Sequence, residues 1–143
     1  MKIAIRYKVM KVFNNERYDN PNVVDYNGEN LKLECIMWTN DWGKLHRPYG
    51  KPAQITFFES GEVYIEIFAL NGQYYREGGR PNEIIYFKNG QTEEELWRNG
   101  SGLLDYPDGR GRLPAKIVYD STGKKIREEY WKNGNYIDSV RFK

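Results

Sequence analysis

The chain has 143 residues, with 22 basic and 20 acidic side chains and a formal net charge of +2. This length suits a single domain, 1–143, and the charge balance argues against a large electrostatic surface for nucleic acid or an anionic membrane. The single cysteine excludes an internal disulfide and is typical of a reducing compartment. The sequence shows neither the apolar core of a signal peptide nor a run as long as a membrane span, so it favours a soluble protein of the cytoplasm.

Residues 1–37 are predicted to form an N-terminal strand followed by a degenerate hairpin. A strand is expected over 2–13, where apolar residues occupy both alternating sets, and a turn over 14–17. The segment 21–38 is a shortened version of the hairpins that follow, with its turn at Asn27-Gly28. Degenerate terminal copies are usual in repeat proteins because they cap the array.

Three hairpins are predicted within 38–136 because one pattern recurs from each of three prolines. Counting from the proline, isoleucine follows at +3, an aromatic residue at +5, glycine at +9, glutamate at +14 and a second aromatic residue at +16. Apolar and polar residues alternate around these positions, as in a strand, and the glycine suits a tight turn. The matching residues are Pro52, Ile55, Phe57, Gly61, Glu66 and Phe68; Pro81, Ile84, Tyr86, Gly90, Glu95 and Trp97; and Pro114, Ile117, Tyr119, Gly123, Glu128 and Tyr130.

The turns of this array are predicted at residue pairs that end in glycine. The hairpin turns are expected to have two residues and to fall at Ser60-Gly61, Asn89-Gly90 and Thr122-Gly123. An Asn-Gly pair closes each copy, at Asn71-Gly72, Asn99-Gly100 and Asn133-Gly134, and a last strand follows over 137–143. With 12 Tyr, 6 Phe and 4 Trp and no long helical pattern, the chain is expected to be all-β, with roughly ten antiparallel strands.

The pattern W-x-x-N-G, H-R-x-x-G-x-P-A-x-I, G, E-x-aromatic, N-G resembles the variant MORN-type repeats found in bacterial, phage and large-virus proteins. The resemblance covers 38–136 and implies an elongated antiparallel meander of tandem hairpins in a single sheet. It also implies a binding scaffold, since the family includes antitoxin-like members. The residues that carry it in the first copy are His46, Arg47, Gly50, Pro52, Ala53, Gly61, Glu66, Phe68, Asn71 and Gly72.

The glutamate of each copy is expected to lie among apolar residues on the face common to all copies. With two-residue turns, Phe57 would face Tyr64 and Ile55 would face Glu66. A carboxylate in such a place needs a partner. We therefore hypothesise an arginine–glutamate staple within each copy, with a row of catalytic carboxylates as the alternative; the residues concerned are Arg47, Glu66, Arg76, Glu95, Arg110 and Glu128.

The opposite face changes from apolar in the first copy to charged in the third. Two interpretations are open: residues 2–38 fold over its apolar part, or that part remains open as a partner or self-association surface. The loop 39–44 adds an aromatic residue at its tip. The candidate partner-binding residues are Trp42, Phe58, Val63, Ile65, Ile67 and Phe87.

The sequence contains no recognisable enzyme motif, and no catalytic, cofactor or metal site is expected. His46 is the only histidine and holds a repeat position, and Cys35 fits a buried thiol. The segments Gly78-Gly79-Arg80 and 109–112 could bind phosphate but precede no helix, and turn chemistry explains both.

The function expected from these features is a non-enzymatic, cytoplasmic inhibitor or neutraliser of another protein, antitoxin-like or phage anti-defence in type, with self-association also open. The alternative is a sponge for nucleotides or single-stranded nucleic acid that uses aromatic stacking and the Gly-Arg loops. The near-neutral charge makes nucleic acid the less favoured partner.

Overall fold

The computed structural model describes residues 1–10, 23–26 and 29–143, and the side chains of 1–6 and 33–143. The turns expected at 14–17 and at Asn27-Gly28 lie outside the described residues, as does the end of the strand expected over 2–13. The elements are β1 (Lys2–Met10), β2 (Val23–Tyr26), β3 (Glu29–Thr39), β4 (Gln54–Phe57), β5 (Val63–Ile67), β6 (Ala69–Leu70), β7 (Gln73–Tyr74), the 3-10 turn η1 (Glu77–Gly79), β8 (Glu83–Tyr86), β9 (Thr92–Leu96), β10 (Lys116–Tyr119), β11 (Lys125–Lys132) and β12 (Asn135–Arg141).

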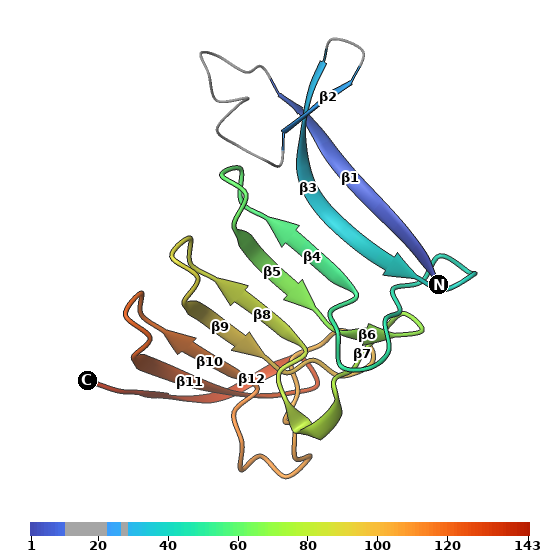
Figure 1. Cartoon of the computed structure of the whole chain (residues 1–143). Coiled ribbons are helices and arrows are strands. Elements are labelled where there is room, and N and C mark those ends of the chain that lie inside the picture. The colour runs from blue at the N-terminus through green and yellow to red at the C-terminus, as the bar shows by residue number, and fades with distance from the viewer. Residues whose placement is uncertain (11–22, 27–28) are drawn as a thin grey trace.

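Ten of these strands form one open antiparallel sheet (Figure 1). Nine follow the order β1-β3-β4-β5-β8-β9-β10-β11-β12, and β2 pairs with β3 beside this path. The all-β, antiparallel prediction is therefore confirmed. The separate two-stranded sheet of β6 and β7 was not predicted. No helix of the described part is long and apolar enough to cross a membrane.

The hairpins β4–β5, β8–β9 and β10–β11 close through the same kind of turn. In the first, the Phe58 N–H donates to the Glu62 carbonyl at 2.9 Å, and the Gly61 N–H donates back to Phe58 at 2.9 Å; the same two bonds occur in the other hairpins. The turn positions are as predicted, but a two-residue turn is wrong. A type I turn followed by a left-handed residue makes a three-residue loop, and that residue is Gly61 (φ +102°), Gly90 (φ +86°) or Gly123 (φ +89°).

A bulge follows each turn and shifts the register by one residue. Ile55 pairs with Glu66 as predicted, but the register changes between Thr56 and Phe57, so that Phe57 pairs with Val63. Tyr64 is the extra residue, and its ring contacts Phe58 at 4.5 Å instead of facing Phe57. The other two hairpins shift at the corresponding points.

Beyond the bulges, one row of paired residues crosses the sheet. Its middle alternates isoleucine and glutamate: Glu66 and Glu95 each pair with an isoleucine of their own hairpin and with one of the next, and Glu128 pairs with Ile117 and with Val140 of β12. We call it the central row. Its members are Ile5, Ile36, Ile55, Glu66, Ile84, Glu95, Ile117, Glu128 and Val140.

The opposite face holds the more buried side chains of the strands, including Cys35, Leu96 and Val118. Burial raises the pKa of the Cys35 thiol, as expected of a structural cysteine. The described strands of 2–38 continue the sheet sideways, with β3 paired to β4, so the interpretation that they fold over this face is wrong. Ile65 and Ile67 remain half-buried.

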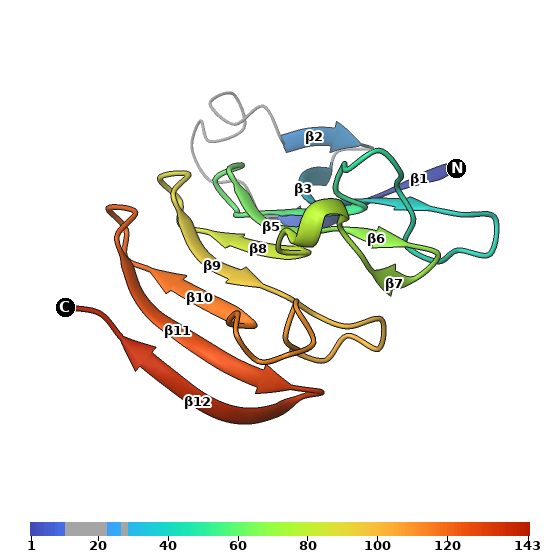
Figure 2. The ribbon, with the colours of Figure 1, turned by 90° about the horizontal axis from the view of Figure 1, so that it is seen from below.

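The two ends of the hairpins form two edges of the molecule (Figures 1 and 2). The turn edge consists of the three hairpin turns. The loop edge consists of three longer connections: the first, 40–53; the second, 68–82, which contains β6, β7 and η1; and the third, 97–115.

Candidate binding site

The loop edge is held together by asparagine side chains that bridge neighbouring connections. The Asn40 side chain accepts hydrogen bonds from its own loop and donates to Asn71 Oδ1 at 3.3 Å. In the third connection the Asn99 side chain likewise accepts hydrogen bonds from backbone N–H groups of its own loop, and it donates to Asn133 Oδ1 at 3.1 Å. His46 Nδ1 accepts the Asn71 N–H at 3.1 Å, which is a structural contact.

All three Asn-Gly pairs lie in turns, but only two of these turns have the same geometry. Asn71-Gly72 and Asn133-Gly134 connect β6 to β7 and β11 to β12, with φ of +50° and +81° in the first and +47° and +80° in the second. Two consecutive positive φ values define the type I′ turn that Asn-Gly favours. Asn99-Gly100 is different: the left-handed residue there is Gly102 (φ +83°), and Asn99 caps the loop. The turn predicted at this pair is therefore present, but it spans Asn99 to Gly102.

The arginine–glutamate staples are wrong. Arg47 donates through Nη1 to the Pro52 carbonyl at 3.1 Å and lies over the Trp38 ring at 3.8 Å. Arg76 donates to the Pro81 carbonyl at 3.0 Å and lies over the Phe68 ring at 3.9 Å. Each arginine therefore closes its own connection. The third connection is closed by Asp108, whose carboxylate accepts hydrogen bonds from the backbone N–H groups of Arg110, Gly111 and Arg112.

The glutamates of the central row bind tyrosines of the following hairpin. Tyr86 donates its hydroxyl to Glu66, and Tyr119 donates to Glu95. Burial and this hydrogen bond raise the pKa of both tyrosines above the ordinary value. Glu128 instead accepts from Lys125 at 2.5 Å and from Tyr130 at 3.3 Å. These carboxylates are half-buried. Each has a partner, as expected, but that partner is a tyrosine or a lysine and not an arginine.

A cavity of about 230 Å³ lies between the second and third connections. Trp97 fixes one wall, because its Nε1 donates to the Gly79 carbonyl at 2.8 Å. The lining is mainly aromatic and basic: Tyr74, Tyr75, Arg76, Gly79, Arg80, Asn82, Trp97, Arg98, Asn99, Gly100, Asp105, Tyr106 and Pro107.

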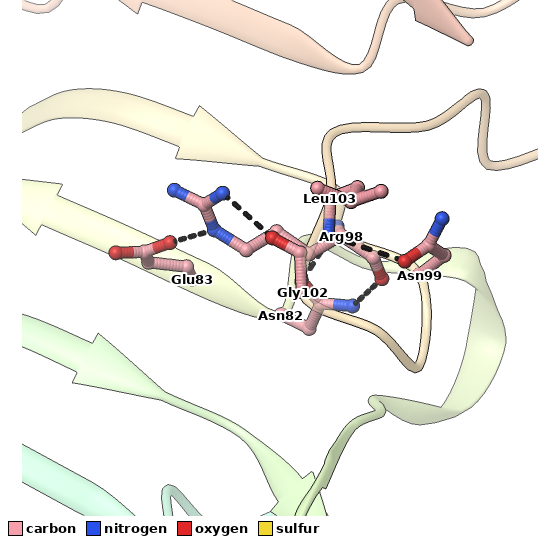
Figure 3. Close-up of polar contacts among 6 residues, drawn as sticks. All are labelled: Asn82, Glu83, Arg98, Asn99, Gly102 and Leu103. Carbon is pink, nitrogen blue, oxygen red and sulfur yellow. Dashed lines mark hydrogen bonds and ion pairs between the residues drawn. The ribbon is translucent and has the colours of Figure 1, made fainter. Parts of the chain in front are cut away.

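Arg98, which is part of the lining, anchors the third connection to the start of β8 (Figure 3). The Asn82 amide bonds the Arg98 backbone twice, donating to its carbonyl at 2.8 Å and accepting its N–H at 2.9 Å. The guanidinium pairs with Glu83 and donates to the Gly102 carbonyl at 3.0 Å. Asn82 and Glu83 are buried, at 7% and 8% exposure. Buried and mutually satisfied polar groups are rigid, so the cavity is preformed.

Arg76 and Arg80 give the cavity its positive charge. Within the described residues neither forms an ion pair, although both line the cavity. The Arg76 Nε is buried and has no hydrogen-bond partner, while Arg80 Nε donates to the Glu77 carbonyl at 3.1 Å. Burial lowers the pKa of Arg76, and the charge of Arg80 lowers it further, whereas the charges of Glu66 and Glu95 oppose this shift. Asp105, the acidic residue of the lining, accepts hydrogen bonds from Asn99 and from two backbone N–H groups.

The first and second connections share a left-handed backbone segment. Tyr49 and Gly50 have φ of +67° each, and Gly78 and Gly79 have φ of +76° and +66°. In both connections these residues stand three and two positions before the proline. A left-handed conformation costs a residue with a side chain about 1–2 kcal/mol. Tyr49 adopts it although its side chain is 89% exposed.

The structure does not bring the predicted partner-binding residues into one patch. Trp42 is 82% exposed on the loop edge, beyond the bridge between Thr39 and Leu45. Phe58 and Phe87 belong to the turn edge, at the opposite ends of the strands, and both are half-buried. Val63, Ile65 and Ile67 lie along β5 between the two edges.

Sequence reasoning missed Tyr49, Tyr75 and Tyr106 as site residues. The signal for Tyr49 was available, because it occupies the position that glycine holds in the next connection. The cavity itself gave no signal, because it depends on how closely the second and third connections approach each other.

Comparisons with protein-family models, with curated proteins and with solved structures find no match for this chain.

Proposed function

We propose that this protein is a non-catalytic scaffold of variant MORN-type repeats that binds another protein through its loop edge and thereby inhibits or neutralises it. The repeated spacing in 38–136 supports the family, and the antitoxin-like members of that family motivate the inhibitory role. The proposed setting is the cytoplasm of a bacterial cell or an infected host cell.

The observation that carries this proposal is the exposure of two aromatic side chains on the first connection. Trp42 is 82% exposed and Tyr49 is 89% exposed. Large aromatic residues supply most hot spots of protein interfaces, because they bury much area and lose little side-chain entropy. Tyr49 also holds a backbone conformation that glycine would adopt at lower cost. Retaining tyrosine there favours a role in binding.

Affinity capture from a lysate of the source cells tests the proposal with three matched variants. Trp42→Ala and Tyr49→Gly should each weaken capture of one specific protein by about tenfold or more. Ile137→Ala removes another exposed apolar side chain, 54% exposed, from β12 and should leave capture unchanged. The purified wild type should then inhibit the captured protein, whereas Trp42→Ala should not.

Tyr49→Gly separates binding from folding. It relieves the left-handed strain, so the free energy of unfolding should stay equal or rise by up to about 1 kcal/mol. A variant that is at least as stable as the wild type but binds less tightly assigns Tyr49 to the interface. If both aromatic variants capture the same protein as tightly as the wild type, the loop edge is not the binding surface.

A further inference from the structure

The cavity between the second and third connections has features of a ligand site that the proposed protein-binding surface does not use. Trp42 and Tyr49 do not line it. Its walls are fixed by the Trp97–Gly79 hydrogen bond and by the Asn82–Arg98 contacts (Figure 3), so little ordering is needed before a ligand can enter.

The charge of the lining selects for an anion. Arg98 is neutralised by Glu83, and Asp105 is satisfied by its own hydrogen bonds. The positive charges of Arg76 and Arg80 remain, and within the described residues neither is paired with a carboxylate. A guanidinium presents several N–H donors in a planar array that matches phosphate oxygens. Arg76 already donates through Nη1 to the Pro81 carbonyl, so its other amino group and Arg80 are the donors left for a phosphate.

The rest of the lining selects for a planar ring. Tyr75, Trp97 and Tyr106 contribute aromatic surface, and Tyr75 is 49% exposed. A nucleobase stacks on such side chains whatever its identity, because every base has a π face. A volume of about 230 Å³ is below the range of about 300–1,000 Å³ typical of sites that enclose drug-sized ligands, so a mononucleotide would be only partly enclosed.

We infer that this cavity binds a nucleoside monophosphate, with the phosphate on Arg76 and Arg80 and the base against Trp97 and the neighbouring tyrosines. The modest net charge of +2 does not oppose this, because one phosphate needs only a local pair of cations. Gly78 and Gly79 hold left-handed conformations immediately before Arg80, which is part of the cavity lining.

Titration calorimetry with AMP, GMP, CMP and UMP tests the inference, with adenosine and inorganic phosphate as partial ligands. At least one nucleoside monophosphate should bind at least tenfold more tightly than either partial ligand, and its affinity should fall with added salt. Arg80→Gln should weaken binding about tenfold, because it removes a charged donor from an exposed side chain. Arg112→Gln is the matched control, since Arg112 is exposed on the third connection but does not line the cavity, and it should change affinity less than twofold.

Two further variants separate loss of nucleotide binding from loss of folding and from the proposed protein-binding function. Trp97→Phe keeps a ring but loses the bond to Gly79, and it should weaken the nucleotide more than inorganic phosphate. Trp42→Ala should leave nucleotide affinity unchanged, so failure of one proposal does not imply failure of the other. The inference is overturned if no nucleoside monophosphate binds at millimolar concentration, including the case in which only a single-stranded oligonucleotide binds. It is also overturned if inorganic phosphate binds as tightly as the nucleotide, or if folded Arg80→Gln binds the nucleotide like the wild type.

Discussion

The turn edge and the loop edge solve the same problem, reversing the chain between strands, in different ways. At the turn edge the three turns have the same two hydrogen bonds and the same left-handed glycine, at Gly61, Gly90 and Gly123. At the loop edge the first two connections are closed by the same arginine bond to a proline carbonyl, from Arg47 or Arg76, but they differ in side chains such as Tyr49, and the third is closed by Asp108 instead. Uniform geometry is what a scaffold requires, whereas a binding surface needs residues that differ from place to place. This difference is why we place binding at the loop edge.

The middle of the sheet should belong to the scaffold and give the largest effect on stability. Ile65→Asp places a carboxylate in β5 between Thr56 and Ile85, its partners on the two neighbouring strands. We expect the free energy of unfolding to fall by about 2–4 kcal/mol, because apolar burial is lost and a charge is desolvated. Urea denaturation measures this. A variant of wild-type stability that loses its protein partner would place the interface on this face instead.

The carboxylates of the central row should come next. Glu95→Ala leaves the Tyr119 hydroxyl without its acceptor, and we expect a loss of about 1–3 kcal/mol. Glu93→Ala in the same strand is the control and should change stability by less than about 0.5 kcal/mol. Equal losses in both variants would contradict a specific tyrosine–glutamate link between strands.

Sequence spacing was enough to predict the hairpins, because a period of two and a turn glycine mark them. The Ile55–Glu66 pairing was right although the two-residue turn was wrong, because the bulge at Tyr64 compensates for the third residue of the loop. The spacing did not predict the hydrogen-bond partner of each glutamate, because that partner is a tyrosine of the neighbouring hairpin for Glu66 and Glu95. One signal was present in the sequence. Phe57 stands where the other two hairpins have a tyrosine, and the strand before it, β3, has Ile36 where the strand before each of those tyrosines has a glutamate. The bulge that displaces Tyr64 and the approach of Arg80 to the cavity depend on three-dimensional packing, for which no local pattern exists.

A matched pair of glycine variants compares the two edges directly. Gly90→Ala and Gly79→Ala both force a side chain into a left-handed conformation in open space, with φ of +86° and +66°. Each should cost about 1–2 kcal/mol. Only Gly79→Ala should also weaken AMP binding, because the Gly79 carbonyl holds Trp97. Calorimetry on the two folded variants measures their nucleotide affinities. An equal loss of affinity in both would contradict the distinction between the edges.

High pH gives a smaller effect that reports on the tyrosine–glutamate links. The pKa of Tyr119 is raised above its ordinary value of 10.0, so above that pH the folded protein retains a proton that the unfolded chain releases. The stability advantage of the wild type over Tyr119→Phe should be fully present below pH 10 and shrink as the pH rises further. Denaturant melts of both proteins between pH 8 and about pH 11 measure the difference. An advantage that grew with pH would have the wrong sign.

Hydrogen exchange of the complex with the captured protein tests the division between the two edges most directly. Backbone amides of the first connection, 40–53, should gain protection on binding, and those of the second connection beside it should gain less. The turns at 58–62, 87–91 and 120–124 should exchange as in the unbound protein. Protection confined to these turns, with 40–53 unchanged, would contradict the assignment of binding to the loop edge.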